Sequence, residues 1–356
     1  MRNIRKLDFS DNIFYVGIDV HKKSWNVTVN SGHVNLETFS MNPSPAELKK
    51  HLERKYPGGK YYSVYEAGFC GFWIHRELCK LGVINQVINP ADVPTTDKEK
   101  RYKTDSRDSH KLSRELAKHC LQAIYIPDEY AEAIRGLSRS RERVVSHQTR
   151  LKNRIKSFLT IKGKELAPNS ECKHWSANFM KTLEQMTFSQ EIDKKTFQFL
   201  LKDLKETRQE VLEVTRQLRS HAKSDACQAI IKYLLTVPGV GFIVAITFYT
   251  EIIDIRRFKN NDHLVSFVGF TPGTHSSGEK NRTTGLTPRR NRFLRYLLIE
   301  AAWVAIRKDP ALFMQYTTLL KRMPKQDAII RIAKKLVNRM RNVWINERPY
   351  VLGIIE

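Results

Sequence analysis

The sequence predicts an α/β domain at the N-terminus, a long helical middle segment and a mainly α-helical C-terminal region. Short apolar and aromatic runs alternate with helical patterns as far as Ile126, as expected for α/β structure. The middle of the chain then keeps a 3-4 apolar spacing, and a Pro-Gly-Val-Gly turn separates two further apolar helical runs. We therefore expect three segments, at residues 1–128, 129–228 and 229–356.

The first segment opens with three neighbouring strands, expected at residues 14–20, 25–30 and 33–41 from their apolar alternation. A capping box at Ser44-Pro45-Ala46-Glu47, with proline at the first helical position, marks the start of a helix. The remaining elements alternate between strand and helix: strand 61–66, helix 71–81 closed by Gly82, strand 83–88, helix 105–119 and strand 121–126. Three antiparallel strands followed by alternating helices and strands are typical of a ribonuclease-H-like (RuvC-type) domain.

Four carboxylates fall at the ends of these elements. Asp19 and Glu66 each end a predicted strand, while Asp105 and Asp108 share one face at the start of a predicted helix. Clustered acids repel one another unless divalent cations neutralise them, and Mg²⁺ or Mn²⁺ is the cofactor we expect. Two such ions can stabilise both the attacking and the leaving oxygen of a phosphoryl displacement. A single acid after a strand is usually a turn or cap residue, so the prediction rests on the shared placement.

Charge indicates the class of partner. The chain has 61 Lys and Arg against 37 Asp and Glu, a formal net charge of +24 at pH 7. Such an excess favours nucleic acid or an anionic membrane surface. We expect no membrane span and no secretion, because the sequence has neither an eighteen-residue apolar run nor a signal peptide. Its five scattered cysteines lack CxxC spacing and are expected to be free thiols of a cytosolic protein.

The middle segment predicts two long helices. Apolar residues from Ile134 to Phe158, and again from Phe197 to Leu218, follow the 3-4 spacing of a coiled-coil seam, although Arg141 and Gln148 interrupt the first run. The same spacing suits an antiparallel hairpin that packs on itself, and the sequence leaves this alternative and a dimerising coiled coil open. Residues 163–175 are expected to form the loop between the two arms.

The C-terminal region carries a second set of candidate residues. Gly239 and Gly241 of the PGVG turn suit a helix-hairpin-helix motif, in which backbone N–H groups approach a phosphate. A tight turn without DNA contact is the alternative. Further on, a stretch without acids contributes six basic residues as candidate phosphate contacts: Lys280, Arg282, Arg289, Arg290, Arg292 and Arg295. A basic helix is expected from Lys321 to Arg341, although charge runs are commonly solvated faces.

Several motifs in order resemble one family: GIDVHKKSW, YEAG, KTDSRDS, PGVG, and GFTPGTHSSGEK followed by RFLRYLLIEAAW. Together they resemble the DEDD insertion-sequence transposases, relatives of the pilin-gene invertases whose members are implicated as bridge-RNA-guided recombinases. The resemblance implies that the four acids bind metal and that Ser277, before the glycine of the Ser-Gly motif, is the nucleophile. Ser276 adjoins it, so the register stays open. Thr287-Pro288-Arg289 departs from the Lys-x-Gly segment of relatives.

The same resemblance implies the partners. They are DNA at element ends or junctions and at a target, a noncoding guide RNA, and further copies of the chain in a homo-oligomer, dimer or tetramer. It also implies a prokaryotic, cytoplasmic, nucleoid-associated protein. A serine hydroxyl needs a base or metal to remove its proton. His275 lies two residues away, while the resemblance suggests that the metal-bearing acids act on the serine, including across protomers.

Three functions compete at this point. The first is a serine-plus-metal recombinase that moves an insertion sequence. The second is a metal-dependent nuclease or Holliday-junction resolvase, in which Ser277 only contacts phosphate. The third is a non-catalytic nucleic-acid-binding scaffold, which four clustered acids disfavour because they repel phosphate. The Ser-Gly motif and the basic C-terminal region favour the first.

Overall fold

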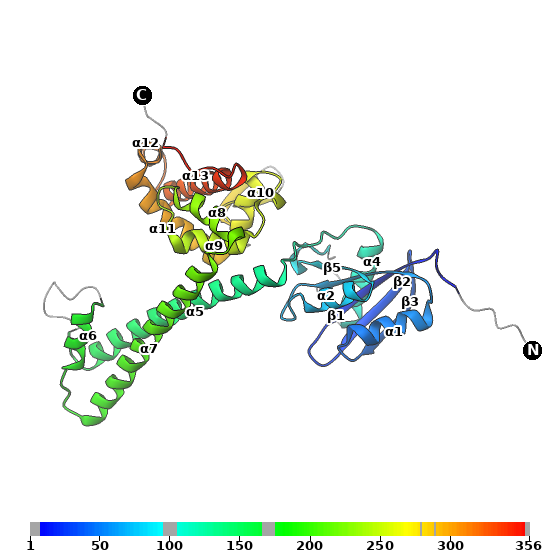
Figure 1. Ribbon diagram of the computed structural model, residues 1–356, viewed down its shortest axis with the longest axis horizontal. Coiled ribbons are helices and arrows are strands. Elements are labelled where there is room, and N and C mark those ends of the chain that lie inside the picture. The colour runs from blue at the N-terminus through cyan, green and yellow to red at the C-terminus, as the bar shows by residue number, and fades with distance from the viewer. Residues whose placement is uncertain (1–7, 95–104, 166–174, 278–279, 288–289, 353–356) are drawn as a thin grey trace, which may run out of the picture. The chain divides into compact units, whose positions relative to one another are not determined.

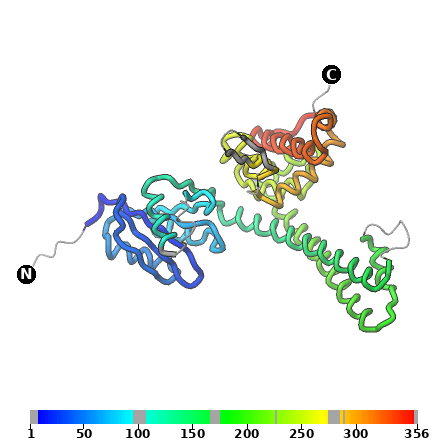
Figure 2. Tube along the Cα trace, turned by 180° about the vertical axis from the view of Figure 1, so that it is seen from behind, coloured from blue at the N-terminus to red at the C-terminus, as the bar shows by residue number. Residues whose placement is uncertain are grey.

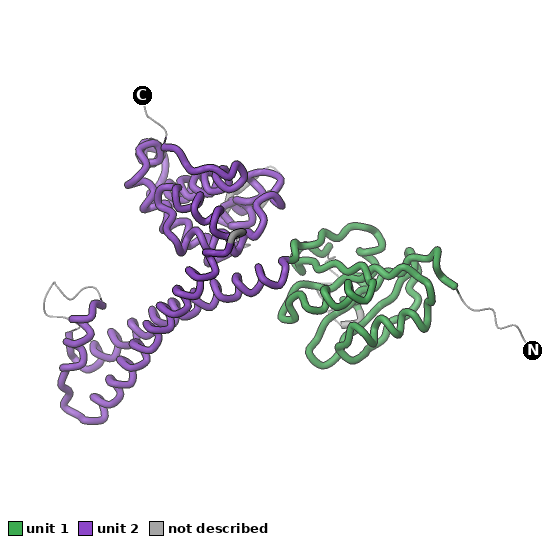
Figure 3. The backbone as a smooth tube through the Cα atoms, in the orientation of Figure 1, with its two compact units in different colours: residues 1–126 green, residues 127–356 purple. Residues whose placement is uncertain are grey.

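The computed structural model describes residues 8–94, 105–165, 175–277, 280–287 and 290–352. Within these ranges the side chains of residues 105, 106, 225, 226, 274–277 and 280–284 are not described. The chain forms two compact units, residues 1–126 and 127–356 (Figure 3). The predicted subdivision of the second unit at residue 228 stays a prediction. Among the described helices, none combines the length and apolar character that crossing a membrane requires.

The first unit is built on a five-stranded sheet with the order β3-β2-β1-β4-β5. Its strands are β1 (Ile13–Val20), β2 (Trp25–Ser31), β3 (Val34–Met41), β4 (Lys60–Glu66) and β5 (Ile84–Ile88). The first three strands pair antiparallel, while β4 runs parallel to β1, and β5 parallel to β4. The α/β prediction for this part of the chain is therefore confirmed.

Helices cover both faces of this sheet (Figure 1). Helices α1 (Pro45–Lys55) and α2 (Trp73–Lys80) pack on one face, where Leu48, Leu52, Ile74 and Leu78 join the apolar side chains of β1 and β2. Helix α4 (Asp105–Ala117) packs on the other face through Leu112 and Leu116. The expected capping box is partly realised, since Ser44 Oγ accepts a hydrogen bond from the Glu47 amide at 3.2 Å.

The edge strand β3 is tied to α1 by Glu37. Its carboxylate accepts hydrogen bonds from His51 at 2.9 Å, Lys55 at 3.0 Å and the Tyr56 hydroxyl at 3.1 Å. Partial burial acts to raise the pKa of Glu37, but the bonds from His51 and Lys55 outweigh it and lower that pKa. This cluster therefore fastens α1 to the edge strand of the sheet.

One expected strand is absent. Residues 121–126 make a single antiparallel bridge between Ile88 and Ala123, and the Ile124 amide bonds to Val87 O at 2.8 Å. Ile124 and Ile126 instead pack against the core beneath the sheet. Pro127 follows directly and has no amide hydrogen with which to extend a ladder. The segment therefore lies beside β5 without forming a sixth strand.

The second unit contains a long antiparallel helical pair, α5 (Glu129–Ile161) and α7 (Glu191–His221), which lie side by side in Figures 1 and 2. At one end Lys162 Nζ lies 2.8 Å from Asp193 Oδ1, and towards the other Arg141 Nε donates to Thr215 Oγ1 at 2.8 Å. The apolar seams of α5 and α7 therefore pack against each other within one chain, as the antiparallel-hairpin alternative predicts. The short helix α6 (Ala177–Glu184) lies between them in the chain, and α8 (Asp225–Leu235) follows α7.

The rest of the second unit is a helical bundle with a small hairpin. Its elements are α8, α9 (Phe242–Ile252), η3 (Ile255–Arg257), α10 (Asn261–Val268), β6 (Pro272–Ser277), β7 (Lys280–Leu286), α11 (Arg292–Lys308), α12 (Pro310–Leu320) and α13 (Lys325–Ile345). The expected basic helix is α13, but nine of its residues, from Ala328 to Trp344, are buried. It is a core helix whose basic residues occupy the remaining faces.

A buried carboxylate joins α5 to this bundle. Glu251 on α9 is 2 % exposed, and both of its oxygens accept bonds from the Arg139 guanidinium, at 2.7 and 2.8 Å. Asn291, the N-cap of α11, donates a third bond at 2.7 Å. The hydrogen bonding that Arg139 donates to Glu251 raises the pKa of Arg139. Bidentate pairing with a third donor is the arrangement that compensates a buried charge.

The PGVG turn gives the two glycines different roles. Gly239 has φ +87°, and a Cβ there would lie 2.5 Å from Ala301 O on α11. Gly241 caps α9 with φ −91°, and a Cβ there would meet nothing within 4 Å. The first glycine is therefore required by close packing, whereas the second leaves open space beside the start of α9.

We expect Gly239→Ala to lower the free energy of unfolding by at least about 2 kcal/mol, because strain at positive φ adds to the clash with α11. Gly241→Ala is the matched control and should change it by less than about 1 kcal/mol. Chemical denaturation followed by circular dichroism measures both. Equal losses in the two variants would contradict this packing role for Gly239.

Candidate active site

Asp19 is the residue before the last of β1, and Glu66 is the last residue of β4, which runs parallel to β1. The register pairs Ile18 with Tyr65, so the next residue on each strand is one of the two acids. Neighbouring strands lie about 4.8 Å apart. The two carboxylates therefore emerge side by side at the carboxyl end of the sheet, and both are half-buried.

Gly17 identifies the face on which these acids lie. Side chains alternate along a strand, so position 17 shares a face of β1 with Asp19. A Cβ at Gly17 would lie 2.1 Å from the Ser109 carbonyl oxygen and 2.5 Å from the Ser113 amide nitrogen. Helix α4 therefore touches β1 backbone to backbone, on the face that carries the two acids.

The direction of α4 brings its first turn towards the same end of the sheet. Beyond the C-terminal end of α4, the ring of His119 lies 6.0 Å from that of Tyr15, while Ser109 lies over Gly17. The helix thus runs antiparallel to β1, and its N-terminal turn, with Asp105 and Asp108, lies nearest the strand ends. A buried hydrogen bond of 2.9 Å between Ser109 Oγ and Thr28 Oγ1 fixes the helix on β2.

The fold thus gathers the chain positions of all four acids at one end of the first unit. Asp108 is half-buried, and the side chain of Asp105 lies outside the described residues. Where side chains are described, no three His, Cys, Asp or Glu side chains form a metal-binding group. Asp19 Oδ2 lies 3.1 Å from Nε2 of His21, which is 46 % exposed. Oxygen donors of this kind suit Mg²⁺ or Mn²⁺.

Two contributors to this site were missed in the sequence. Thr28 and Gly17 carry no catalytic chemistry, yet they seat α4. The signal for Gly17 was present, because a glycine inside an otherwise apolar strand, as in FYVGIDV, commonly marks a close backbone approach. Thr28 has no comparable signal, since its partner Ser109 is 81 residues away.

The candidate serine lies in the second unit. Ser277 ends β6 and pairs with Lys280 at the start of β7, while Ser276 pairs with Asn281 and His275 with Arg282. The backbone therefore places both serines at the end of a two-stranded hairpin. The side chains of His275, Ser276, Ser277, Lys280 and Arg282 lie outside the described residues, as does Arg289 altogether.

The remaining predicted arginines differ from one another. Arg290 and Arg292 are exposed, just before and at the start of α11. Arg295 instead donates to Gly269 O at 2.9 Å and to Thr287 O at 3.4 Å, tying α11 to the end of α10 and the base of the hairpin. Desolvation, followed by repulsion from Arg290, lowers the pKa of Arg295. Its bonds give it a positioning role for the hairpin.

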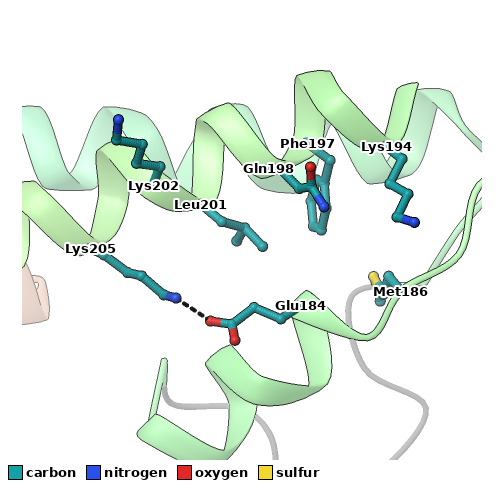
Figure 4. Close-up of a pocket in the computed structure, with 8 residues that line it drawn as sticks. All are labelled: Glu184, Met186, Lys194, Phe197, Gln198, Leu201, Lys202 and Lys205. Atoms are coloured by element: carbon teal, nitrogen blue, oxygen red, sulfur yellow. Dashed lines mark ion pairs between the residues drawn. The ribbon is translucent and has the colours of Figure 1, made fainter. Parts of the chain in front are cut away.

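A shallow pocket of about 310 Å³ occurs elsewhere, near the end of the α5–α7 hairpin (Figure 4). Phe197 and Leu201 line its floor, and Lys205 Nζ forms an ion pair of 2.5 Å with Glu184 Oε1 across its rim. None of its lining residues is a predicted site residue. The candidate acids therefore lie outside this pocket, at the strand ends of the first unit.

Comparison with known proteins identifies the family. A DEDD transposase model of the IS110 type matches residues 16–162, and a model described as "Transposase IS116/IS110/IS902 family" matches residues 231–317. The chain belongs to this family of transposases. The first match contains all four acids, and the second contains the glycine turn and the serine hairpin.

Individual relatives agree with the family matches. The transposase of insertion sequence IS1533 from Leptospira borgpetersenii is 25 % identical over 94 % of this chain and 96 % of its own length. A Sinorhizobium fredii protein named as a transposase, y4qE, is 29 % identical over 81 % of this chain and 71 % of its own. The IS1111A transposase of Coxiella burnetii is 24 % identical over 75 % of this chain and 73 % of its own length. These relatives are similar to this chain along most of its length, and they agree with the family matches.

We expect Gly17→Ala to push α4 away from β1, because a methyl group at this position overlaps the Ser109 and Ser113 backbone. The free energy of unfolding should fall by about 3 kcal/mol, and DNA cleavage should fall with it even where the protein remains folded. Gly68→Ala is the control, since its Cβ would meet only Glu66 O, at 4.0 Å. Full cleavage by Gly17→Ala would show that α4 need not touch β1.

Proposed function

We propose that this transposase is a recombinase with a ribonuclease-H-like domain, a DEDD divalent-metal site and a serine nucleophile. The observation that carries the proposal is the register of Asp19 with Glu66 at adjacent strand ends, with the first turn of α4 on the same face. The strand order β3-β2-β1-β4-β5, three strands antiparallel and two added in parallel, supports the ribonuclease-H-like assignment.

Asp19, Glu66, Asp105 and Asp108 would hold Mg²⁺ or Mn²⁺. When bound, such ions supply positive charge that stabilises a phosphodiester during displacement. The carboxylates themselves orient the ion and fix where the phosphate lies. His21, hydrogen-bonded to Asp19 at 3.1 Å, restricts the rotation of that carboxylate and so preserves its position before a substrate binds.

Ser277 would act at the phosphate. Its Oγ forms a bond to phosphorus, and the bond to the leaving deoxyribose oxygen breaks, with the serine proton transferred to that oxygen. A deoxyribose hydroxyl of the receiving strand later attacks the phosphoserine, which restores the serine. The number of phosphoester bonds is unchanged, so strand exchange needs no nucleotide cofactor. Lys280 and Arg282, near the serine on β7, would stabilise the charged phosphate.

A guide RNA and a homo-oligomer, dimer or tetramer, complete the proposal. Both rest on the family resemblance, and the +24 net charge supports a nucleic-acid partner in general. Sequencing of RNA that copurifies with the protein tests the first, and analytical ultracentrifugation tests the second. Purification free of any defined RNA, with full recombination activity, would refute the RNA guide.

The acids are tested by substitution. Asp19→Asn, Glu66→Gln and Asp108→Asn should each lower the cleavage rate by about 100-fold or more, because each removes a charge on which ion binding depends. DNA binding and the thermal unfolding temperature should change little. Glu77→Gln is the control, an exposed carboxylate on α2 of the same unit. Cleavage that persists in excess EDTA would exclude the metal site.

The serine is tested by trapping. A DNA substrate nicked near the exchange point should leave protein covalently attached to DNA, and Ser277→Ala should lose both the adduct and recombination while still binding. Ser276→Ala is the matched control for the register, since loss of the adduct there would move the nucleophile by one residue. Cleavage by both variants without an adduct would favour the alternative, a nuclease or junction resolvase that uses water.

A further inference from the structure

An aromatic ring is presented to solvent directly beyond the candidate carboxylates. Phe69, three residues after Glu66, is 64 % exposed, and Trp73 at the start of α2 is 46 % exposed. Single apolar side chains on a surface are ordinary. Two large aromatic residues four positions apart, directly beyond a strand that ends in a candidate metal ligand, are a more specific arrangement.

The backbone around Phe69 is fixed by hydrogen bonds. The Gly71 amide bonds to Gly68 O at 3.2 Å, so Phe69 is the second residue of a four-residue turn. The hydroxyl of the buried Tyr65 donates to Gly71 O at 3.0 Å, and the Ala67 amide bonds to Ile88 O at 2.7 Å. The ring is therefore exposed by a well-anchored turn, which reduces the entropy lost when a ligand covers it.

A lysine from the other acid-bearing strand meets this ring. Lys22 is three residues beyond Asp19, and its Nζ lies 6.0 Å from the centre of the Phe69 ring. The loops that follow Asp19 and Glu66 therefore meet at this point. An ammonium group beside an aromatic ring offers two contacts: a charge for phosphate and a flat apolar face.

The second aromatic residue is anchored from beneath. The ring centres of Trp73 and the fully buried Trp25 are 6.5 Å apart. Trp25 pairs with Val20, the last residue of β1. The exposed part of Trp73 is thus held near the same end of β1 as Asp19, on the side of the sheet that α2 covers.

Nucleic acid fits this combination of groups. Proteins that hold single strands stack bases on exposed aromatic rings while cations follow the backbone. A base within a duplex has no free face, so the ring can stack only on an unpaired one. We propose that Phe69, Lys22 and Trp73 form a stacking site for an unpaired base of the DNA strand beside the phosphate to be cut. The inference rests on the proposed function, which makes the neighbouring acids the place of cutting.

Photocrosslinking tests the contact without requiring cleavage. Asp19→Asn protein without divalent ions would be irradiated with a single-stranded oligonucleotide that carries 5-iododeoxyuridine, and the adducts mapped by mass spectrometry. We expect an adduct at Phe69 or Trp73. Phe199 on α7, 68 % exposed, is the internal control. Adducts at Phe199 as abundant as at Phe69, or none at Phe69 and Trp73, would overturn the proposal.

Substitution then separates stacking from simple apolar contact. Phe69→Ala should weaken binding of an oligothymidylate by about tenfold, whereas Phe69→Trp should retain it and Phe199→Ala should not affect it. An abasic oligonucleotide of the same length should bind both Phe69→Ala and the parent protein equally. Lys22→Ala should weaken the binding of both oligonucleotides, since in this proposal Lys22 contacts a phosphate that both of them carry. If Phe69→Ala lost as much affinity for the abasic oligonucleotide as for oligothymidylate, stacking would be refuted.

The two experiments distinguish this inference from the proposed function. If the acids do not bind metal, cleavage tests fail while the Phe69 adduct persists. If Phe69 does not stack on a base, the adduct is absent while the Asp19 and Glu66 substitutions still abolish cleavage. A strand of RNA in place of DNA serves as a third arm. A stronger Phe69 adduct with RNA than with DNA would overturn the assignment of the cut DNA strand as the occupant.

Discussion

The contact between α4 and β1 at Gly17 is the constraint on which the first unit depends. Because position 17 has no side chain, the helix backbone lies directly against the strand, and Ser109 reaches Thr28 on the next strand. A side chain here would displace the helix from the sheet. Asp105 and Asp108 would then move away from Asp19 and Glu66, although none of the four would itself have changed. The geometry of the acids is thus set by a residue with no functional group.

The second unit depends on a charge in the same way. Glu251 is buried, and it is compensated by two bonds from Arg139 and one from Asn291. These residues come from three helices, α5, α9 and α11, so a single carboxylate fixes their mutual arrangement. Removal of Arg139 would leave an uncompensated buried charge, whereas removal of Asn291 would take away one of the two hydrogen bonds that Glu251 Oε2 accepts. The start of α11, from which Arg292 projects, is therefore held by a group that never contacts nucleic acid.

Much of this organisation could be predicted from local sequence. Strand ends at Asp19 and Glu66, the N-cap at Ser44 and the helix that begins at Asp105 follow from patterns within a few residues. What could not be predicted depends on distant pairs. The bond between Thr28 and Ser109 and the failure of residues 121–126 to form a strand are set by packing. The basic helix α13 is buried on one face for the same reason.

For the site residues too, some features follow from local sequence and others depend on residues that are distant in the chain. The register that aligns Asp19 with Glu66 depends on the parallel pairing of two strands, whereas the sequence indicated only that each acid lies at a strand end. A run of basic residues does not tell which of its arginines are free to contact phosphate and which bond to the protein's own backbone. Arg295 bonds to Gly269 and Thr287, while Arg290 beside it is exposed. Similarly, the two glycines of PGVG look equivalent in the sequence, but only Gly239 lies against α11.

The distal part of the α5–α7 hairpin has a hydrophobic core of its own. Leu151, Ile155 and Phe197 belong to a cluster separate from the one formed by the C-terminal bundle. Since the two arms are antiparallel, equal numbers of residues could be removed from both without altering the bundle. Seven residues from each arm, about 10 Å of length, preserve the apolar spacing. The hairpin is therefore a spacer of adjustable length. A designer could use this property to vary how far the tip of the hairpin extends from the bundle.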